Sequence, residues 1–197
     1  MEQRIANVHR KTGETDITMK LNLDGNGKAD VSSGIGFFDH MMDAFARHGL
    51  FDLELKVDGD LVVDGHHSVE DTGIVLGEAI KEAVGDKKGI KRYGFFVLPM
   101  DEALILCAVD LCGRPFFAME GAPIKAPMVG DLDTELVSEF FYAVSYSAAM
   151  NLHFRILAGT NAHHIIEGMF KCFSKALDMA TQKEERIKDV LSTKGSL

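Results

Sequence analysis

Alternation of apolar and polar residues near the start of the chain predicts β-strands. Along residues 15–23 every second residue is apolar, which is typical of a strand with one buried face. Phe38, Met41 and Phe45 instead follow helical spacing, and His48-Gly49 marks the end of that helix. The strands expected in this part of the chain are residues 4–10, 15–23 and 51–57, and the helices are residues 36–47 and 66–84.

The same succession of elements returns after a polar break at Gly85 to Gly89. There the expected strands are residues 93–98, 103–110 and 152–157, and the expected helices are residues 133–149 and 162–180. Each half therefore reads strand, strand, helix, strand, helix, which indicates an internal duplication with the two halves packed together. We predict an α+β protein with a first half over residues 1–88, a second half over residues 89–181 and a tail over residues 182–197.

Two copies of one short motif open the last helix of each half. They are His66-His67-Ser68-Val69-Glu70 and His163-His164-Ile165-Ile166-Glu167. Residues four apart share a helix face, so the first histidine and the glutamate of each copy point the same way. The second histidine lies about 100° further round the helix. Two imidazoles and a carboxylate suit a divalent transition metal, and a matched pair of motifs strengthens that interpretation.

One copy alone cannot complete an octahedral coordination shell. Our hypothesis is cross-pairing, in which His66 and Glu70 bind one ion with His164, while His163 and Glu167 bind a second ion with His67. Different subunits would supply the partners, because one helix cannot turn both faces inward in a small fold. Asp39-His40, on the middle helix of the first half, is a further ligand candidate.

Composition narrows the class of protein. The 197 residues carry a formal net charge of -9, which argues against a nucleic-acid surface, because phosphate backbones attract basic faces. Neither a signal peptide in residues 1–10 nor an apolar run of the ~20 residues that a membrane span needs is visible. Three cysteines without paired spacing fit a reducing cytoplasm rather than a disulfide framework or a zinc–thiolate site. We therefore expect a cytoplasmic protein with no nucleic-acid or membrane partner.

Motifs along nearly the whole chain resemble those of the imidazoleglycerol-phosphate dehydratase family of histidine biosynthesis. Besides the two histidine motifs, they are Gly36-Phe37-Phe38-Asp39-His40-Met41, Gly89-Ile90-Lys91-Arg92-Tyr93-Gly94, Met100-Asp101-Glu102-Ala103, Leu157-Ala158-Gly159-Thr160-Asn161, Phe170-Lys171 and Ser192-Thr193-Lys194-Gly195. Arg10-Lys11-Thr12-Gly13-Glu14-Thr15 also resembles the opening strand pair of the family. The motifs occur in order, so their combination is specific.

This resemblance implies two half-domains, each a four-stranded sheet with two helices on one face, packed helix to helix. It implies a homo-oligomer, a shell of twenty-four subunits with sites at subunit interfaces, and two Mn²⁺ ions per subunit. The implied reaction converts D-erythro-imidazole-glycerol phosphate into imidazole-acetol phosphate and water, with the imidazole held as a metal-bound imidazolate. The implied ligands are His40, His66, His67, Glu70, His163, His164 and Glu167.

In two places the chain departs from the family pattern. Glu139 stands where many members have a metal-binding histidine, and a carboxylate can replace imidazole on manganese. Ala44 stands where many members have a glutamine, so a substrate contact is missing there.

Dehydration of the implied substrate requires a group that moves protons and cations that hold a phosphate. Glu14 is our first candidate for proton transfer and Glu167 the second, with Asp101 as a supporting hydrogen-bonding residue. The phosphate candidates are Arg92, Arg114, Lys171, Ser192, Thr193 and Lys194. We expect the tail to become ordered when substrate binds.

Two other functions stay open at this point. One is a different metal-dependent lyase or isomerase that acts on a phosphorylated small molecule. The other is a metal-storing shell without catalysis, for which Arg92, Arg114 and Lys194 would have no use.

Overall fold

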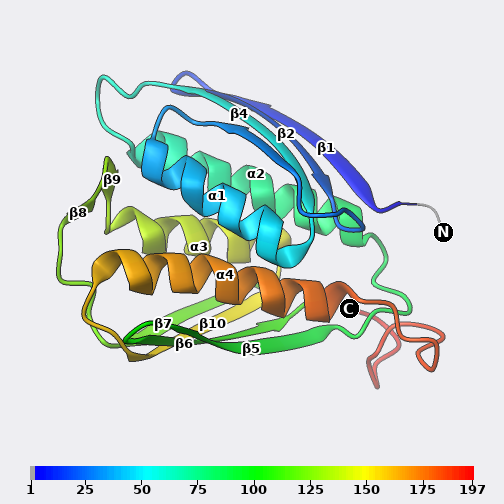
Figure 1. The fold of residues 1–197 in the computed structure, drawn as a ribbon. Coiled ribbons are helices and arrows are strands. Elements are labelled where there is room, and N and C mark those ends of the chain that lie inside the picture. Colours follow the sequence, from blue (N-terminus) through cyan, green and yellow to red (C-terminus); the bar gives the residue numbers. More distant parts are fainter. Residues whose placement is uncertain (1–2) are drawn as a thin grey trace.

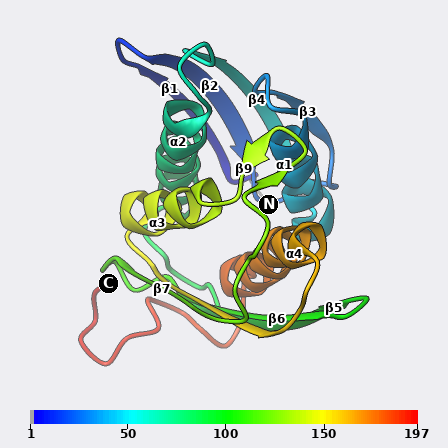
Figure 2. The same cartoon turned by 90° about the vertical axis from the view of Figure 1, so that its left-hand side faces the viewer.

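Two four-stranded sheets form the outer layers of the molecule, and the helices fill the space between them (Figure 1). The computed structural model describes residues 3–197. Helices α1 (Gly36–Gly49) and α2 (His66–Val84) cover the inner face of the first sheet. Helices α3 (Leu136–Ala148) and α4 (Ala162–Thr181) cover that of the second (Figure 2). This arrangement confirms the predicted α+β fold with helices packed on helices.

The two main sheets have the same topology. The first has the order β1-β2-β4-β3 and the second the order β5-β6-β10-β7, with the last strand of each order parallel to its neighbour. The strands of the first are β1 (Ile5–Lys11), β2 (Thr15–Asn22), β3 (Ala29–Ser32) and β4 (Asp52–Gly59). Those of the second are β5 (Tyr93–Met100), β6 (Ala103–Asp110), β7 (Phe116–Gly121) and β10 (Asn151–Ala158).

Some elements escaped the sequence pattern. The edge strands β3 and β7 were not predicted, because most of their residues are exposed or half-buried and no alternation marks them. The expected helix over residues 133–149 begins later, at Leu136, because residues 128–133 form a small hairpin of β8 (Met128–Val129) and β9 (Leu132–Asp133). At the turn of this hairpin Asp131 accepts hydrogen bonds from the backbone N–H groups of Gly36 and Phe37, at 2.6 and 2.9 Å. A residue of the second half therefore caps the first turn of α1, the helix that carries His40.

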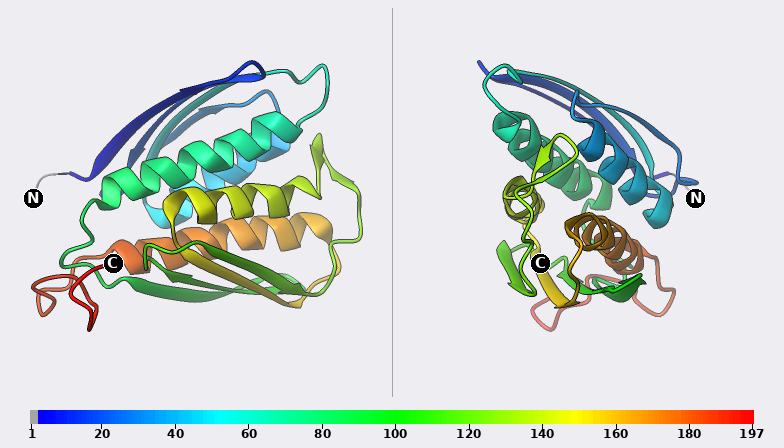
Figure 3. Two further views of the ribbon diagram at one scale, coloured as in Figure 1. Left: turned by 180° about the vertical axis from the view of Figure 1, so that it is seen from behind. Right: turned by 60° about the vertical axis from the view of Figure 1, so that its left-hand side comes forward.

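Packing between the halves pairs α2 with α3 and α1 with α4. Aromatic rings fill much of this interface, among them Phe38, Phe140, Phe141, Phe170 and Phe173. Glycines let α2 and α3 approach closely. A Cβ on Gly73 would lie 2.6 Å from the carbonyl oxygen of Phe140, and one on Gly77 would lie 2.7 Å from that of Val144. All four helices begin at the same end of the molecule, so both histidine motifs are brought to that end (Figures 1 and 3).

Backbone contacts hold the tail at the opposite end of the molecule (Figure 1). Lys183 forms an isolated β-bridge with Ile90, and the N–H of Gly89 donates to the carbonyl of Asp189. No helix in residues 3–197 is long and apolar enough to cross a membrane.

Candidate active site

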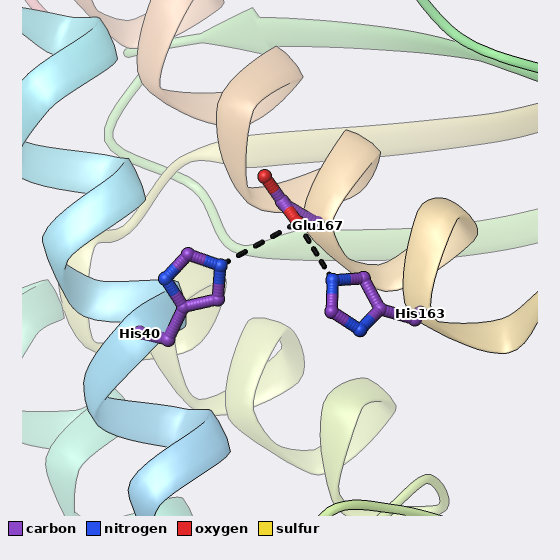
Figure 4. Close-up of side chains that lie close together, drawn as sticks. All are labelled: His40, His163 and Glu167. Atoms are coloured by element: carbon purple, nitrogen blue, oxygen red, sulfur yellow. Dashed lines mark hydrogen bonds and ion pairs between the residues drawn. The ribbon is translucent and has the colours of Figure 1, made fainter.

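Three side chains from two helices form a group suited to a metal ion. His40 on α1 and His163 and Glu167 on α4 offer ligand atoms that all lie within 4.8 Å of one another (Figure 4). Nε2 of His163 lies 2.9 Å, and Nε2 of His40 3.5 Å, from the same carboxylate oxygen of Glu167. The helical i, i+4 spacing sets the first contact, and the packing of α1 on α4 sets the second.

Glu167 also contacts a cation. The ammonium group of Lys171, one helical turn further along α4, lies 2.5 Å from its other carboxylate oxygen. Burial by itself raises the pKa of Glu167, but hydrogen bonds from Lys171 and His163 outweigh it and leave the pKa below its ordinary value. A cavity of about 400 Å³ beside this group is lined by Lys171, His40 and Ala44. The structure thus places Lys171 with the metal candidates rather than with the other phosphate candidates.

The duplication places related side chains near the starts of α2 and α3, but within residues 3–197 only His40, His163 and Glu167 bring their ligand atoms within 4.8 Å of one another. On α2, Nε2 of His66 lies 3.7 Å from Glu70, so this pair shares a face as the spacing predicts. Helices α1 and α3 both end at a residue in the left-handed conformation, Leu50 and Ala149. His40 and Glu139 each lie ten residues before that end and so occupy equivalent positions.

Glu139 faces the same cavity as His66. This cavity of about 610 Å³ has a strongly acidic lining that includes Asp64, Asp131, Asp133 and Glu135. We call His40, His163 and Glu167 the α1–α4 group, and His66, Glu70 and Glu139 the α2–α3 group.

The second histidine of each motif faces a different set of carboxylates. Nδ1 of His67 lies 3.0 Å from Asp60, and its Nε2 lies 3.7 Å from Glu14. Nδ1 of His164 lies 2.7 Å from Glu102, and its Nε2 lies 3.6 Å from Asp101. Glu14 and Asp101, the proton-transfer and supporting candidates, therefore take corresponding places beside the two rings.

These carboxylates shift the titration of the rings that they contact. The hydrogen bond with Asp60 raises the pKa of His67, and the hydrogen bond with Glu102 raises the pKa of His164. Contacts with His164 and with the N–H groups of Asn161 and Thr160 lower the pKa of Glu102 to about 2.

Within residues 3–197 of one chain, the cross-paired sets, such as His66 and Glu70 with His164, do not form a group of facing ligands.

The remaining basic candidates gather around the tail. A cavity of about 640 Å³ is lined by Arg92, Arg114, Ser192, Thr193 and Lys194. Arg92 donates two hydrogen bonds to Asp110, at 2.7 and 3.1 Å, and a third to the carbonyl of Leu191. This guanidinium therefore ties the start of β5 to the tail as well as lining the cavity.

The tail cavity and the α1–α4 group lie far apart in one chain. The backbone N–H of Arg92 donates to the carbonyl of Ala180, near the end of α4. Ala180 follows His163 by 17 residues, or about 26 Å along the helix axis.

Sequence reasoning missed two residues beside the motifs, Asp60 and Glu102. Asp60 lies in the loop after β4, and Glu102 lies directly before β6. Neither position follows a periodicity that would mark it, although Glu102 falls inside one of the family-like stretches. Their contacts appear only when the loops are placed against the helix starts.

Comparison with known proteins gives consistent matches. A family model described as "Imidazoleglycerol-phosphate dehydratase" matches residues 33–177. A protein of that name from Lachnoclostridium phytofermentans is 60% identical over 194 residues, covering 98% of both chains. One from Acetivibrio thermocellus is 58% identical over 190 residues, covering 96% of this chain and 97% of that protein.

Solved structures agree. An imidazoleglycerol-phosphate dehydratase from Staphylococcus aureus superposes with a TM-score of 0.82 at 37% identity, covering 91% of this chain and 99% of that one. An enzyme of the same family from Pyrococcus furiosus, in complex with a compound named (S)-C348, also gives a TM-score of 0.82, at 34% identity, covering 96% of this chain and 100% of that one.

Proposed function

The chain belongs to the imidazoleglycerol-phosphate dehydratase family, and on that premise we propose that it performs the dehydration step of histidine biosynthesis. The substrate is D-erythro-imidazole-glycerol phosphate and the products are imidazole-acetol phosphate and water. The observation that carries the proposal is the pair of equivalent histidine–carboxylate groups at the starts of α2 and α4. A biosynthetic reaction on a small polar molecule and three unpaired cysteines support a cytoplasmic location.

We propose that each chain holds two divalent ions such as Mn²⁺, one at the α1–α4 group, whose ligand atoms already lie close together, and one at the α2–α3 group, which other subunits would complete. Imidazole nitrogens and carboxylate oxygens are ligands that manganese accepts, and Nε2 of His163 already lies within hydrogen-bonding distance of Glu167. Each group supplies three ligands, so His67 and His164 of other subunits would add to the shells. When bound, the ions would hold the substrate imidazole as an imidazolate and act as Lewis acids.

Glu14 is the residue proposed to move the proton from the substrate chain. It is exposed, and its carboxylate lies 3.7 Å from Nε2 of His67, beside the ring that would face the substrate. Asp101 would support the substrate from the corresponding place beside His164. Glu167 is the weaker candidate for proton transfer, because Lys171 and His163 already occupy both of its oxygens.

Arg92, Arg114, Ser192, Thr193 and Lys194 are proposed to hold the phosphate, with Lys171 adding a positive charge at the metal end. A separation of about 26 Å along α4 is much longer than a substrate of six carbon atoms and one phosphate can bridge. One chain therefore cannot place its own tail cavity over its own α1–α4 group. This supports a homo-oligomer with composite sites, for which we propose the twenty-four-subunit shell.

Assay of the ketone product after chelation and re-addition of Mn²⁺ tests the activity. We expect activity to disappear with the metal and return with it. The variant Arg114→Ala should lose activity but keep its metal, whereas a metal-storing protein would show no dehydration in any form. The variant His67→Ala should lose ions unequally, because His67 is assigned to one site only; equal loss of both ions would contradict cross-pairing.

Mixed oligomers test the composite site. His163→Ala and Arg114→Ala chains should each be nearly inactive alone, but co-expression should restore part of the activity, because some sites combine an intact metal end with an intact tail. Co-expressed His163→Ala and Glu167→Gln chains provide the control and should stay inactive, since both changes damage the same group. Absence of recovery in the first mixture would refute a site shared between chains.

A further inference from the structure

His67 and His164, the second histidines of the two motifs, share one pattern of contacts at their ring nitrogens, to which the proposed reaction assigns no role. A carboxylate accepts hydrogen bonds, so the ring nitrogen that contacts it must donate. Asp60 contacts Nδ1 of His67 at 3.0 and 3.1 Å, and Glu102 contacts Nδ1 of His164 at 2.7 Å. In a neutral imidazole the lone pair then lies on Nε2.

Nε2 of each ring points toward the carboxylate proposed to contact substrate. The distances are 3.7 Å to Glu14 and 3.6 Å to Asp101, both too long for a hydrogen bond. Each Nε2 therefore has no short hydrogen bond to the carboxylate that it faces, while each Nδ1 has one. Both rings are partly exposed, at 33% and 25%, so a ligand can approach them.

We infer that Asp60 and Glu102 are positioning residues that fix the tautomer and orientation of His67 and His164, so that Nε2 is the atom offered to a metal ion. This inference rests on the proposed function, because it assigns a role within the proposed metal sites. Outer carboxylates of this kind raise the basicity of a ligating imidazole and hold its ring in place.

The two halves reach this arrangement from different backbone positions. Glu102 lies directly before β6, but the residue directly before β2 is Glu14, which faces Nε2 instead. In the first half the Nδ1 contact comes from Asp60, in the loop that follows β4. Symmetry of the duplicated backbone therefore does not explain the common contact, and a shared requirement of the two rings does.

Glu102 has a second task that Asp60 lacks. Its Oε1 accepts from the backbone N–H groups of Asn161 and Thr160, at 2.7 and 3.1 Å, while Oε2 contacts His164. The side chain of Asn161 in turn caps α4 by accepting from the N–H of His163 at 2.9 Å. One carboxylate thus holds both the start of α4 and the ring of its second histidine.

This difference makes glutamine and asparagine unequal tests. In Glu102→Gln the amide oxygen would remain on the two backbone N–H groups, so the NH₂ would face Nδ1 of His164 and favour a proton on Nε2. Both carboxylate oxygens of Asp60 face the ring of His67. In Asp60→Asn the amide can therefore turn its oxygen toward Nδ1, so that His67 keeps the same tautomer. Asp60→Leu removes the acceptor at similar size.

The experiment measures Mn²⁺ affinity of the intact oligomer by electron paramagnetic resonance of free Mn²⁺, with histidine tautomers read from ¹⁵N NMR shifts. Glu102→Gln and Asp60→Leu should each weaken binding by about 10–100-fold, the usual effect of removing an outer-shell partner. Asp60→Asn should change it by less. Glu54→Gln, on the outer face of the first sheet, is the matched control and should bind like the unaltered chain.

His67→Ala separates failure of the inference from failure of the proposed function. Loss of metal in His67→Ala, together with unchanged affinity and unchanged tautomers in Glu102→Gln and Asp60→Leu, would overturn the positioning role alone. Full retention of metal in His67→Ala would overturn the proposed site itself. Thermal unfolding in chelator verifies that each variant folds, and Glu102→Gln keeps the test decisive if Asp60→Leu does not fold.

Discussion

The α1–α4 group and the α2–α3 group occupy equivalent places in the duplicated fold but differ in charge and burial. Glu167 is 9% exposed at its side chain and contacts Lys171, whereas Glu70 is 39% exposed. Counting from the first histidine of each motif, the position of Lys171 is taken in α2 by Ile74. His40 of one group is matched by Glu139 in the other. A duplicated backbone has therefore kept the placement of two ligand sets while their electrostatics diverged.

This divergence gives the two groups different expected metal preferences. The α2–α3 group contributes two carboxylates and one imidazole, and two of its members, His66 and Glu139, line an acidic cavity. The α1–α4 group contributes two imidazoles and one carboxylate, whose charge is offset by Lys171. Carboxylates favour manganese and magnesium, whereas imidazoles favour zinc, iron and nickel, so the α2–α3 group should discriminate more strongly for manganese.

Removing the glutamate of a histidine motif, Glu167 or Glu70, should give the largest effect. Glu167→Gln leaves Lys171 and His163 without their charged partner in a buried place, so we expect turnover at saturating Mn²⁺ to fall by more than the 10–100-fold typical of an outer-shell change. Metal analysis should show loss of one ion per chain. Glu70→Gln is the comparison variant, and we expect it to lose the other ion with less damage to folding. Identical losses of stability in the two variants would show that the difference in burial has no consequence.

Replacing Lys171 tests the charge asymmetry. In metal-free protein at pH 7, Lys171→Met should lower the free energy of unfolding by about 1–3 kcal/mol, because Glu167 loses a charged hydrogen-bond partner. The pKa of Glu167 is below its ordinary value of 4.5 in the folded chain, so its stabilising contribution is present above that pH and is lost as the pH falls through the folded pKa. The difference between the variant and the unaltered chain should therefore shrink on acidification. Denaturant titrations in chelator at pH 7 and pH 4 measure this, with Lys175→Met as the control on the same helix.

Changes at Glu139 should produce the smallest effect on metal binding. Glu139→His would also make the α2–α3 group more like the α1–α4 group. Glu139→Leu should weaken one Mn²⁺ site by at least about tenfold, because the loss of a direct ligand should cost no less than the loss of an outer-shell partner. Glu139→His should recover binding and shift the preference of that site from manganese toward zinc. Competition titrations with the two ions measure both quantities. If Glu139→Leu bound both ions normally, Glu139 would not be a ligand.

Local patterns predicted the elements that carry the site, but not how those elements meet. The facing of His66 with Glu70 follows from helical spacing alone. The meeting of His40 with His163 depends on the packing of α1 against α4, and no local pattern encodes a contact between residues so distant in sequence; the sequence offered His40 as a ligand candidate but not its partner. Lys171 was expected among the phosphate candidates, on the side of the helix that faces the metal. Its i, i+4 spacing from Glu167 is compatible with the ion pair of 2.5 Å that the structure shows, but the sequence did not rank that role above phosphate binding.

The equivalence of His40 and Glu139 was hidden for another reason. It becomes clear when the helices are aligned on their left-handed ends, Leu50 and Ala149, and neither residue is a glycine that would mark such an end in a sequence. The edge strands β3 and β7 were hidden because partial exposure removes the alternation that identifies a strand.

Cross-packing of the helices has a consequence for the origin of the fold. The first helix of each half packs on the second helix of the other, as α1 on α4 and α3 on α2, so the contact is reciprocal. A reciprocal contact is also what two identical chains make around a twofold axis. A free-standing half could therefore have paired with its own copy through the same surfaces. Fusion into one polypeptide would then have allowed histidine at one position and glutamate at its twin, a difference that an identical pair could never have held.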